Sequence, residues 1–342
     1  MSDENYDILL NKTVRVKRDP PMNLERKDVG LFQHEFEIII DVPQFKIFKN
    51  IIINSKGFCY KYFSKHPINK SFDENRIGER NTIEILKDLL NIVLNRNKIS
   101  LSKICWVTDA WSANYFHWLT DVIPKLIYVE KMLPGYTVVL PRDLLSASFV
   151  KRSLNYFKLN YLAISHYQKV TANFFLGLPN FANTGNFLPG FILDTRKIFL
   201  PVQYLTSKRI FVKRKSPYKR RVLNEEEISI ILKKYSFDII DTAEMGLPEQ
   251  IALFSQVNIL IAVHGAALTN MLFMPKKGKV LELRKEGDSI NNCYFSLASA
   301  VDLAYYYQLC KVDNPGIETQ SNNFYVDAGL LEKNIQLMLQ DA

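Results

Sequence analysis

The chain has 342 residues, more than the roughly 250–300 at which single hydrophobic cores stop growing, so two domains are expected. Hydrophobic residues make up 47% and charged residues 23%, a composition that excludes a disordered or fibrous chain. The formal net charge of +9 favours anionic partners. The basic residues are nevertheless dispersed without a nucleic-acid-binding motif, so no nucleic-acid partner is expected.

Cysteine spacing and apolar runs bear on the cellular compartment. The four cysteines are far apart and are expected to be free thiols of a reducing compartment. Residues 1–30 are rich in charge and hold no apolar core of a secretory signal. No uncharged apolar run reaches the roughly 18 residues typical of a spanning helix. We therefore expect a cytoplasmic protein whose contact with the inner membrane, if it has one, is peripheral.

The first part of the chain is expected to form an arm and a small sheet. Residues 1–34 mix charges with two adjacent prolines and show no sustained period. Runs of β-branched and aromatic residues at 37–40, 51–54 and 58–63 predict strands of a small antiparallel sheet. Residues 82–93 repeat apolar side chains at helical spacing. The N-terminal region is therefore expected to be β-rich.

Strands and helices then alternate twice along the chain. The first series is expected as strand 104–107, helix 114–132, strand 137–140, helix 144–157 and strand 161–164. The second is expected as strand 210–212, a helix after 224, strand 237–240, a helix near 248, strand 259–263, helix 264–273, strand 280–283, helix 292–301 and strand 305–309. Such alternation implies βαβ crossovers and parallel sheets, so the predicted fold class is α/β with two Rossmann-like domains.

The domain boundaries follow from the breaks between these series. Pro, Gly and Asn collect without periodicity around residues 179–201, which is typical of a linker. The expected parts are an irregular arm (1–34), a first Rossmann-like domain (35–185), a linker (186–206), a second Rossmann-like domain (207–315) and a C-terminal segment (316–342). The last segment contains an amphipathic helix, expected to pack back across the cleft between the domains.

The most informative motif is the turn that follows the apolar strand 259–263. Gly265, Ala266 and Ala267 keep the backbone uncluttered before a helix begins, so free N–H groups and the positive end of the helix dipole are expected to face a diphosphate. A structural tight turn explains the glycine about as well. His264 and Asn270 border the turn, where a histidine is also compatible with an ordinary core position.

Two further features belong to the same half of the chain. Glu282 interrupts an apolar strand; it would suit the hydroxyls of a ribose or sugar, or would simply face water from an edge strand. A basic loop follows the strand 210–212 and is able to neutralise phosphate oxygens, although charge runs usually mean a solvated loop. Its cationic residues are Lys213, Arg214, Lys215, Lys219, Arg220 and Arg221.

A pair of titratable side chains marks the first domain. His117 and Asp121 are four residues apart on one face of the predicted helix 114–132. A carboxylate that holds an imidazole is a reasonable general base for an acceptor hydroxyl. An ordinary surface pair is the alternative interpretation.

Three blocks of the chain resemble family 61 of the glycosyltransferases, a family that includes plant xylosyltransferases, protein O-GlcNAc transferases and bacterial capsular polysaccharide proteins. The blocks are Asn114-Tyr-Phe-His-Trp-Leu-Thr-Asp-Val-Ile-Pro-Lys-Leu, then Arg214 with Arg220-Arg-Val-Leu-Asn-Glu-Glu-Glu, and finally Glu249-Gln-Ile through His264-Gly-Ala-Ala-Leu-Thr-Asn-Met-Leu-Phe-Met-Pro to Leu281-Glu-Leu. Together they cover about residues 100–310, and Ala267 departs from the family, where a second glycine is frequent.

The resemblance implies an inverting, metal-independent enzyme of the GT-B type, in which two Rossmann-like domains face a cleft. The second domain is expected to bind a nucleotide-sugar donor and the first to bind the acceptor. The resemblance places Gly265, Ala266, Ala267, Thr269 and Asn270 at the diphosphate. It also makes Arg214 and Glu282 donor contacts, and His117 or Asp121 the base.

The expected function is therefore transfer of a sugar from a nucleotide sugar to a hydroxyl of a bacterial capsule or lipopolysaccharide precursor. The expected partners are the donor and a glycan or lipid-linked glycan acceptor, with no cofactor and no metal. Two alternatives remain open: a non-catalytic assembly subunit that binds nucleotide sugars, and a GT-B-like nucleotide-sugar epimerase.

Overall fold

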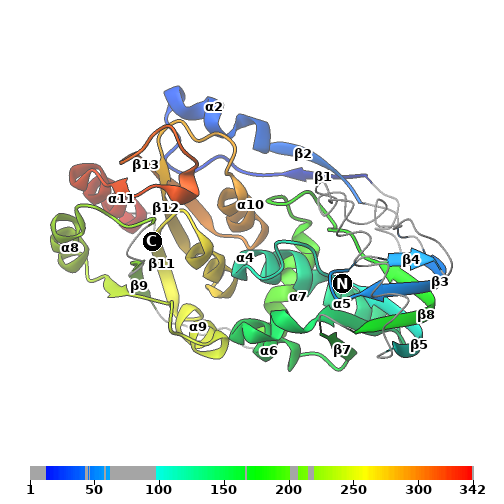
Figure 1. Cartoon of the computed structure of the whole chain (residues 1–342). Helices are drawn as coiled ribbons and strands as arrows, with labels where there is room; N and C mark the ends of the chain where they lie inside the picture. The colour runs from blue at the N-terminus through cyan, green and yellow to red at the C-terminus, as the bar shows by residue number, and fades with distance from the viewer. Residues whose placement is uncertain are drawn as a thin grey trace. The chain divides into compact units, whose positions relative to one another are not determined.

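The computed structural model describes residues 13–42, 45, 47–57, 59–61, 98–165, 168–200, 207–214 and 219–340. The chain forms two compact units (Figure 1). Asp41–Phe181 belongs to the N-terminal unit, and Thr13–Ile40 joins Ala182–Ala342 in the C-terminal unit. The helix expected at 82–93 lies outside the described residues. No described helix has both the length and the apolar character needed to cross a membrane.

The N-terminal unit contains a mixed six-stranded sheet with the strand order β4-β3-β8-β5-β6-β7. β5, β6, β7 and β8 run parallel, whereas β3 is antiparallel to both β4 and β8. The strands are β3 (Ile47–Asn54), β4 (Cys59–Lys61), β5 (Lys98–Trp106), β6 (Thr137–Pro141), β7 (Asn160–Ile164) and β8 (Lys169–Gly177). From β5 the chain proceeds to β6 and β7 on one side and then returns to β8 on the other. The carboxyl ends of β5 and β8 therefore form a topological switch point.

The helical part of this unit begins where the sequence predicts it. Asn114 caps the first turn, and its side chain accepts a hydrogen bond from the backbone N–H of Phe116. The helix then widens into one π-helical turn, a feature that often marks functional sites. The second predicted helix, 144–157, is divided at Ala147. The segments are α4 (Tyr115–His117), η5 (Trp118–Val122), α5 (Ile123–Met132), η6 (Arg142–Ser146) and α6 (Ser148–Leu154).

The C-terminal unit is built on a sheet with the order β10-β9-β11-β12-β13-β14. Its first five strands are parallel, and β14 pairs antiparallel with β13. The strands are β9 (Lys208–Val212), β10 (Asp238–Ile240), β11 (Val257–Val263), β12 (Lys279–Lys285), β13 (Ala304–Val312) and β14 (Phe324–Tyr325). Because β10 lies on one side of β9 and β11 on the other, a second switch point lies between β9 and β11. Both units thus confirm the α/β class with parallel sheets.

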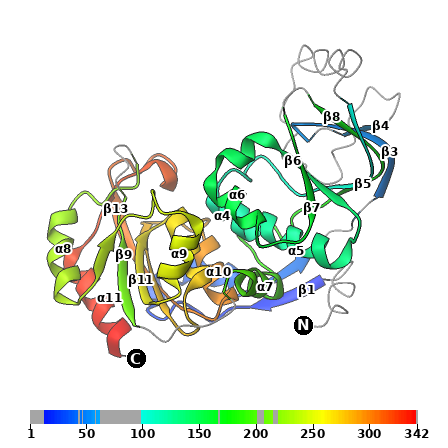
Figure 2. The ribbon, with the colours of Figure 1, turned by 90° about the horizontal axis from the view of Figure 1, so that it is seen from below.

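Helices cover the two faces of this second sheet (Figure 2). One face packs against α8 (Glu225–Lys234) and α11 (Ala328–Gln340), whose Leu331, Ile335 and Met338 are fully buried in the core of the unit. The other face carries α9 (Leu247–Phe254), η7 (Ala266–Phe273) and α10 (Cys293–Ala300). The C-terminal helix, expected to pack back across a cleft, therefore packs on the sheet of its own unit.

Two segments expected to be irregular are ordered. Within the predicted arm, β1 (Thr13–Lys17) pairs with β2 (Glu37–Asp41), and the connection contains η1 (Arg26–Asp28), α2 (Val29–Phe32) and η2 (Gln33–Glu35). The predicted linker contains the helix α7 (Pro189–Phe199). Each segment packs against residues distant in the sequence. The ring centroids of Phe32 and Phe295 are 5.5 Å apart, and those of Phe199 and Phe273 are 5.8 Å apart. Local periodicity gives little sign of such packing.

Candidate active site

The predicted phosphate-binding turn lies at the switch point between β9 and β11. Gly265 is the second residue after β11. It has φ 155° and ψ 176°, a conformation that is essentially restricted to glycine. Ala266 and Ala267 remain partly exposed, so the turn is not sealed in the core. The segment beyond it is a 3₁₀-helix and not the α-helix expected at 264–273, and the N–H of Leu268 already donates to the carbonyl of Gly265. Fewer free N–H groups are thus presented than an α-helix would offer.

Two guanidinium groups converge on this turn. A Cβ atom built on Gly265 would lie 2.8 Å from Nη2 of Arg214 and 2.8 Å from Nη1 of Arg220, so a side chain at this position would displace both arginines. Among the described residues, no carboxylate forms an ion pair with either guanidinium. The Nε of Arg220 is buried without a hydrogen-bond partner.

The electrostatics of the two arginines follow from this crowding. Burial lowers the pKa of both guanidiniums, and the positive charge of Arg220 lowers the pKa of Arg214 further. Arginine nevertheless stays protonated in proteins. Arg220 itself has φ 59°, a left-handed conformation that is uncommon for a non-glycine residue. Two neighbouring cations that form no ion pair in the described part of the chain make a site suited to an anion with several oxygens.

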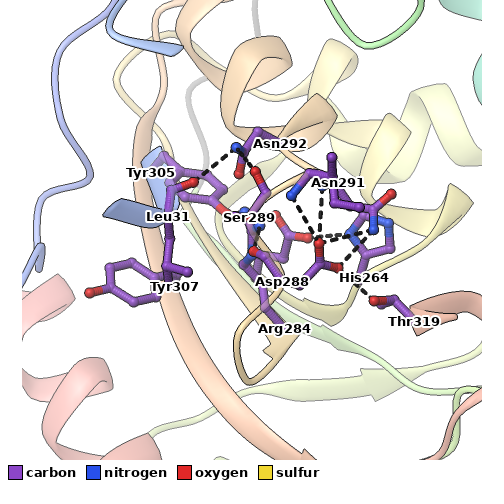
Figure 3. A network of polar contacts seen from close by, with 12 residues as sticks. Leu31, His264, Arg284, Asp288, Ser289, Asn291, Asn292, Tyr305, Tyr307 and Thr319 are labelled. Atoms are coloured by element: carbon purple, nitrogen blue, oxygen red, sulfur yellow. Dashed lines mark hydrogen bonds and ion pairs between the residues drawn. The ribbon is translucent and has the colours of Figure 1, made fainter. Parts of the chain in front are cut away.

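His264 is held by a buried polar network (Figure 3). Its Nδ1 lies 2.5 Å from Oε1 of Glu282 on β12, and the hydroxyl of Tyr305 on β13 donates to Oε2 at 2.6 Å. The other ring nitrogen of His264, Nε2, takes no part in this contact. No hydrogen bond among the described residues involves Nε2 of His264. The histidine is 6% exposed, and the contact with Glu282 fixes the orientation of its ring.

The far side of this network is anchored by an arginine. Nη1 of Arg284 donates to the Tyr305 hydroxyl at 3.2 Å, and Nη2 donates to the backbone carbonyl of Asp288 at 2.8 Å. Burial favours the neutral form of Arg284, but Tyr305 and Glu282 outweigh it and raise its pKa. The guanidinium carbon of Arg284 also lies 4.8 Å from the ring centroid of Phe32, so the N-terminal segment packs against this network.

The structure places the remaining predicted donor contacts in the interior. Glu282 is fully buried and both of its oxygens have partners, so the geometry favours a role in orienting His264 over a direct contact with a donor. Thr269 and Asn270 are also fully buried, and the Asn270 amide donates to Oε1 of Gln250 on α9. The 3₁₀-helix turns these two side chains towards the core, where the bond between Asn270 and Gln250 links it to α9.

In the N-terminal unit, His117 and Asp121 form the predicted pair. Nδ1 of His117 lies 2.8 Å from Oδ2 of Asp121, and the hydroxyl of Thr120 donates to Oδ1 at 3.2 Å. The Asp121 side chain is only 6% exposed, which excludes the alternative of an ordinary surface pair. No described residue hydrogen-bonds Nε2 of His117, so this nitrogen is left without a partner in the described part of the chain while Asp121 holds the ring through Nδ1.

Two residues beside this pair, Asp109 and Trp111, were not among those predicted from the sequence. Both lie in the loop that follows β5, and the ring centroids of Trp111 and His117 are 5.9 Å apart. Burial raises the pKa of Asp109, but the charge of the buried Lys125 and hydrogen bonds from Ser112 and Trp111 outweigh it and lower the pKa overall. Their position after a parallel strand was the available signal, because ligands of open α/β sheets bind at such ends.

The candidate residues thus fall into two groups, one in each unit. Arg214, Arg220 and the Gly265–Ala267 turn come together in the C-terminal unit, with His264 attached to Glu282 next to them. His117 and Asp121 come together in the N-terminal unit. Among the described residues, no group of three or more His, Cys, Asp and Glu side chains is arranged to hold a metal ion.

Comparison with known proteins bears on the family that the chain resembles. A family model described as Glycosyltransferase 61 matches residues 115–281, a range that contains both groups of candidate residues except Glu282. The resemblance to glycosyltransferase family 61 is confirmed.

Curated relatives of family 61 match over a shorter range. An EGF domain-specific O-linked N-acetylglucosamine transferase of Drosophila melanogaster is 34% identical over 98 residues, which are 28% of this chain and 18% of the relative. Its counterpart in Bos taurus is 35% identical over 95 residues, 26% of this chain and 18% of the relative. A β-1,2-xylosyltransferase of Oryza sativa subsp. japonica is 34% identical over 95 residues, 26% of this chain and 17% of the relative.

These matches span less than a fifth of each relative. The names of these relatives describe glycosyltransferases, the class of enzyme that the sequence predicts.

Proposed function

We propose that the chain transfers a sugar from a nucleotide-sugar donor to a hydroxyl group of a glycan, with inversion at the anomeric carbon and without a metal ion. The observation that carries the proposal is the pair of guanidiniums, Arg214 and Arg220, that converge on the Gly265 turn and form no ion pair with a described carboxylate. A nucleoside diphosphate is the leaving group of this reaction, and its developing negative charge requires such a site.

Several donor-side residues stabilise the negative charge of the diphosphate leaving group. Arg214 and Arg220 contact the diphosphate oxygens, each through charge-assisted hydrogen bonds. His264, oriented by Glu282, directs Nε2 towards the same leaving group. The turn itself contributes the N–H groups of Ala266 and Ala267. Together these groups neutralise charge that a divalent ion would otherwise neutralise.

The acceptor-side residues supply the base. Nε2 of His117 removes the proton of the acceptor hydroxyl while its oxygen attacks the anomeric carbon from the face opposite the diphosphate. The bond between that carbon and the diphosphate oxygen breaks, and the nucleotide leaves with the electron pair. Asp121 holds the imidazole through Nδ1 and stabilises the imidazolium that forms. A single displacement of this kind inverts the configuration of the sugar.

The proposal extends to the domain arrangement and the acceptor. A GT-B arrangement is supported by the presence of one parallel sheet with its own switch point in each unit. We propose a bacterial capsule or lipopolysaccharide precursor as the acceptor, handled at the cytoplasmic face of the inner membrane. Support comes from the resemblance to family 61 and the net charge of +9, which favours phosphate-linked acceptors and an anionic membrane surface. Membrane fractionation with lipid-linked acceptors tests this part.

Titration calorimetry tests the donor site. UDP, GDP and CDP are titrated into the wild type and into Arg214→Ala and Arg220→Ala, with and without EDTA. Each variant is expected to bind the preferred nucleotide about tenfold or more weakly, since hydrogen bonds to charged groups contribute about 1.5–3 kcal/mol. Arg221→Ala is the matched control, because this exposed arginine of the same loop does not approach Gly265. Equal affinities in all four proteins would contradict the site.

Stereochemistry tests the reaction. Slow hydrolysis of UDP-N-acetylglucosamine or UDP-xylose, the sugars named by the relatives, is followed by proton NMR before the anomers equilibrate. An inverting enzyme releases the β-anomer first from these α-linked donors. Release of the α-anomer would contradict inversion, and formation of a new nucleotide sugar without an acceptor would indicate an epimerase instead.

A further inference from the structure

One tryptophan of this chain is exposed beside the proposed base. The chain contains three tryptophans, of which Trp106 and Trp118 are 1% and 0% exposed and Trp111 is 60% exposed. An exposed tryptophan leaves a large apolar face in water, which ordinary packing does not explain. Its ring lies at 32° to the His117 ring, with 5.9 Å between the centroids. The indole ring thus lies beside the imidazole proposed to remove the acceptor proton.

The backbone around Trp111 is fixed by a short hydrogen-bonded loop. The N–H of Trp111 donates to Oδ1 of Asp109 at 2.9 Å, and the hydroxyl of Ser112 donates to the same oxygen at 2.9 Å. The N–H of Asp109 donates back to the Ser112 hydroxyl at 2.8 Å. These bonds hold the loop before any ligand binds, so little conformational entropy is lost on binding.

Unpaired polar groups accompany the indole at the switch point between β5 and β8. Asn180 follows β8, and its amide lies 3.5 Å from Oδ2 of Asp109 after β5, so the two strand ends meet there. Oδ1 of Asn180 and Oγ1 of Thr108 are buried without a hydrogen-bond partner. A buried acceptor or hydroxyl without a partner is costly, and a ligand hydroxyl would remove that cost.

From this juxtaposition we infer that Trp111, Asn180 and Thr108 form the subsite for the acceptor sugar. The ligand is an uncharged pyranose: its C–H face stacks on the indole, whose π face is electron-rich, and its hydroxyls reach Asn180 and Thr108. The neighbouring Asp109 carboxylate disfavours an acidic sugar at the same place. The inference rests on the proposed function, because the stacked sugar presents its reacting hydroxyl to His117.

A printed glycan array tests the subsite without requiring turnover. The wild type, Trp111→Phe and Trp111→Ala are applied with Tyr161→Ala, an exposed aromatic at the opposite, amino-terminal end of the parallel strands, as the matched control. Wild type and Tyr161→Ala are expected to retain the same neutral glycans, Trp111→Phe to retain them more weakly, and Trp111→Ala to lose at least tenfold in binding. Equal retention by Trp111→Ala, or no glycan retained by the wild type, overturns the inference.

Intrinsic fluorescence provides a second measurement on the wild type alone. Because only Trp111 is accessible, acrylamide quenches this residue selectively, and the best glycan of the array is expected to protect it. Unchanged quenching at saturating glycan overturns the subsite even if a variant fails to fold. Nucleotide calorimetry separates the two proposals. If glycan protects Trp111 but no nucleotide binds, the transferase function is rejected and a sugar-binding site remains. If a nucleotide binds but glycan does not protect Trp111, only the subsite is rejected.

Discussion

The substitution Gly265→Ala separates the two effects that the turn combines. The new methyl group would lie 2.8 Å from a nitrogen of Arg214 and from a nitrogen of Arg220, against a contact distance of about 3.5 Å. Each guanidinium must therefore retreat by roughly 0.7 Å or rotate away. Both are the ends of flexible side chains, so their displacement costs little folding free energy. The displacement does remove them from the position where the diphosphate is proposed to bind.

The backbone contributes a separate cost. With φ 155° and ψ 176°, residue 265 occupies a region essentially reserved for glycine, and a non-glycine residue there loses about 1–3 kcal/mol of folding stability. For units of this size the melting temperature falls by about 2–4 °C for each kcal/mol. We expect a folded variant with a melting temperature several degrees lower and with at least tenfold weaker binding of pyrophosphate and of the preferred nucleotide.

Gly287→Ala is the matched control for Gly265→Ala. Gly287 has φ 74°, so alanine strains the backbone there too, but no atom lies within 4 Å of the added Cβ. Differential scanning calorimetry and isothermal titration of pyrophosphate and UDP are measured on both variants and the wild type. Gly287→Ala is expected to lose stability and keep its affinity. If Gly265→Ala also keeps its affinity, or both variants lose it equally, the guanidiniums are not the diphosphate site.

Three further outcomes are expected. His117→Ala lowers kcat of transfer by at least about 100-fold, the range for loss of a general base, and Asp121→Asn lowers kcat less. Neither variant changes the Kd of the nucleotide. A parallel loss of nucleotide affinity would argue against the role of this pair as the base. Glu282→Gln and Tyr305→Phe each destabilise the fold by about 1–3 kcal/mol in urea unfolding, because buried polar partners lose hydrogen bonds. EDTA leaves kcat and donor affinity unchanged, and restoration of a lost activity by Mg²⁺ or Mn²⁺ would refute metal independence.

Much of the fold could be predicted from local patterns. The strands that become β6, β9, β11 and β12 are short apolar runs, and most residues of each are buried in a parallel part of a sheet, as their composition indicates. The predicted pair on the helix 114–132 also forms, because a spacing of four residues places both side chains on one face whatever the rest of the chain does. Information of this kind is contained in a few consecutive residues.

The helix after Gly265 shows where local reasoning ends. The sequence predicts an α-helix with free N–H groups, whereas the chain forms a 3₁₀-helix whose Thr269 and Asn270 are buried. The stabilisation of diphosphate charge that was expected from the helix start is proposed to come largely from two guanidiniums. They belong to Arg214 and Arg220, in a loop about 50 residues before Gly265 in the chain. Sequence order carries no information on which nitrogen of Arg214 meets the turn.

The sequence by itself determined the α/β class, the family resemblance and the residue types able to bind a diphosphate or accept a proton. Only the tertiary structure decided that Glu282 orients His264, that Phe32 of the N-terminal segment supports Arg284, and that Trp111 lies beside His117. The physical reason is that helices and strands depend on neighbours within a few residues, whereas burial and pairing of polar groups depend on strand order, which brings the ends of distant strands to one edge of a sheet.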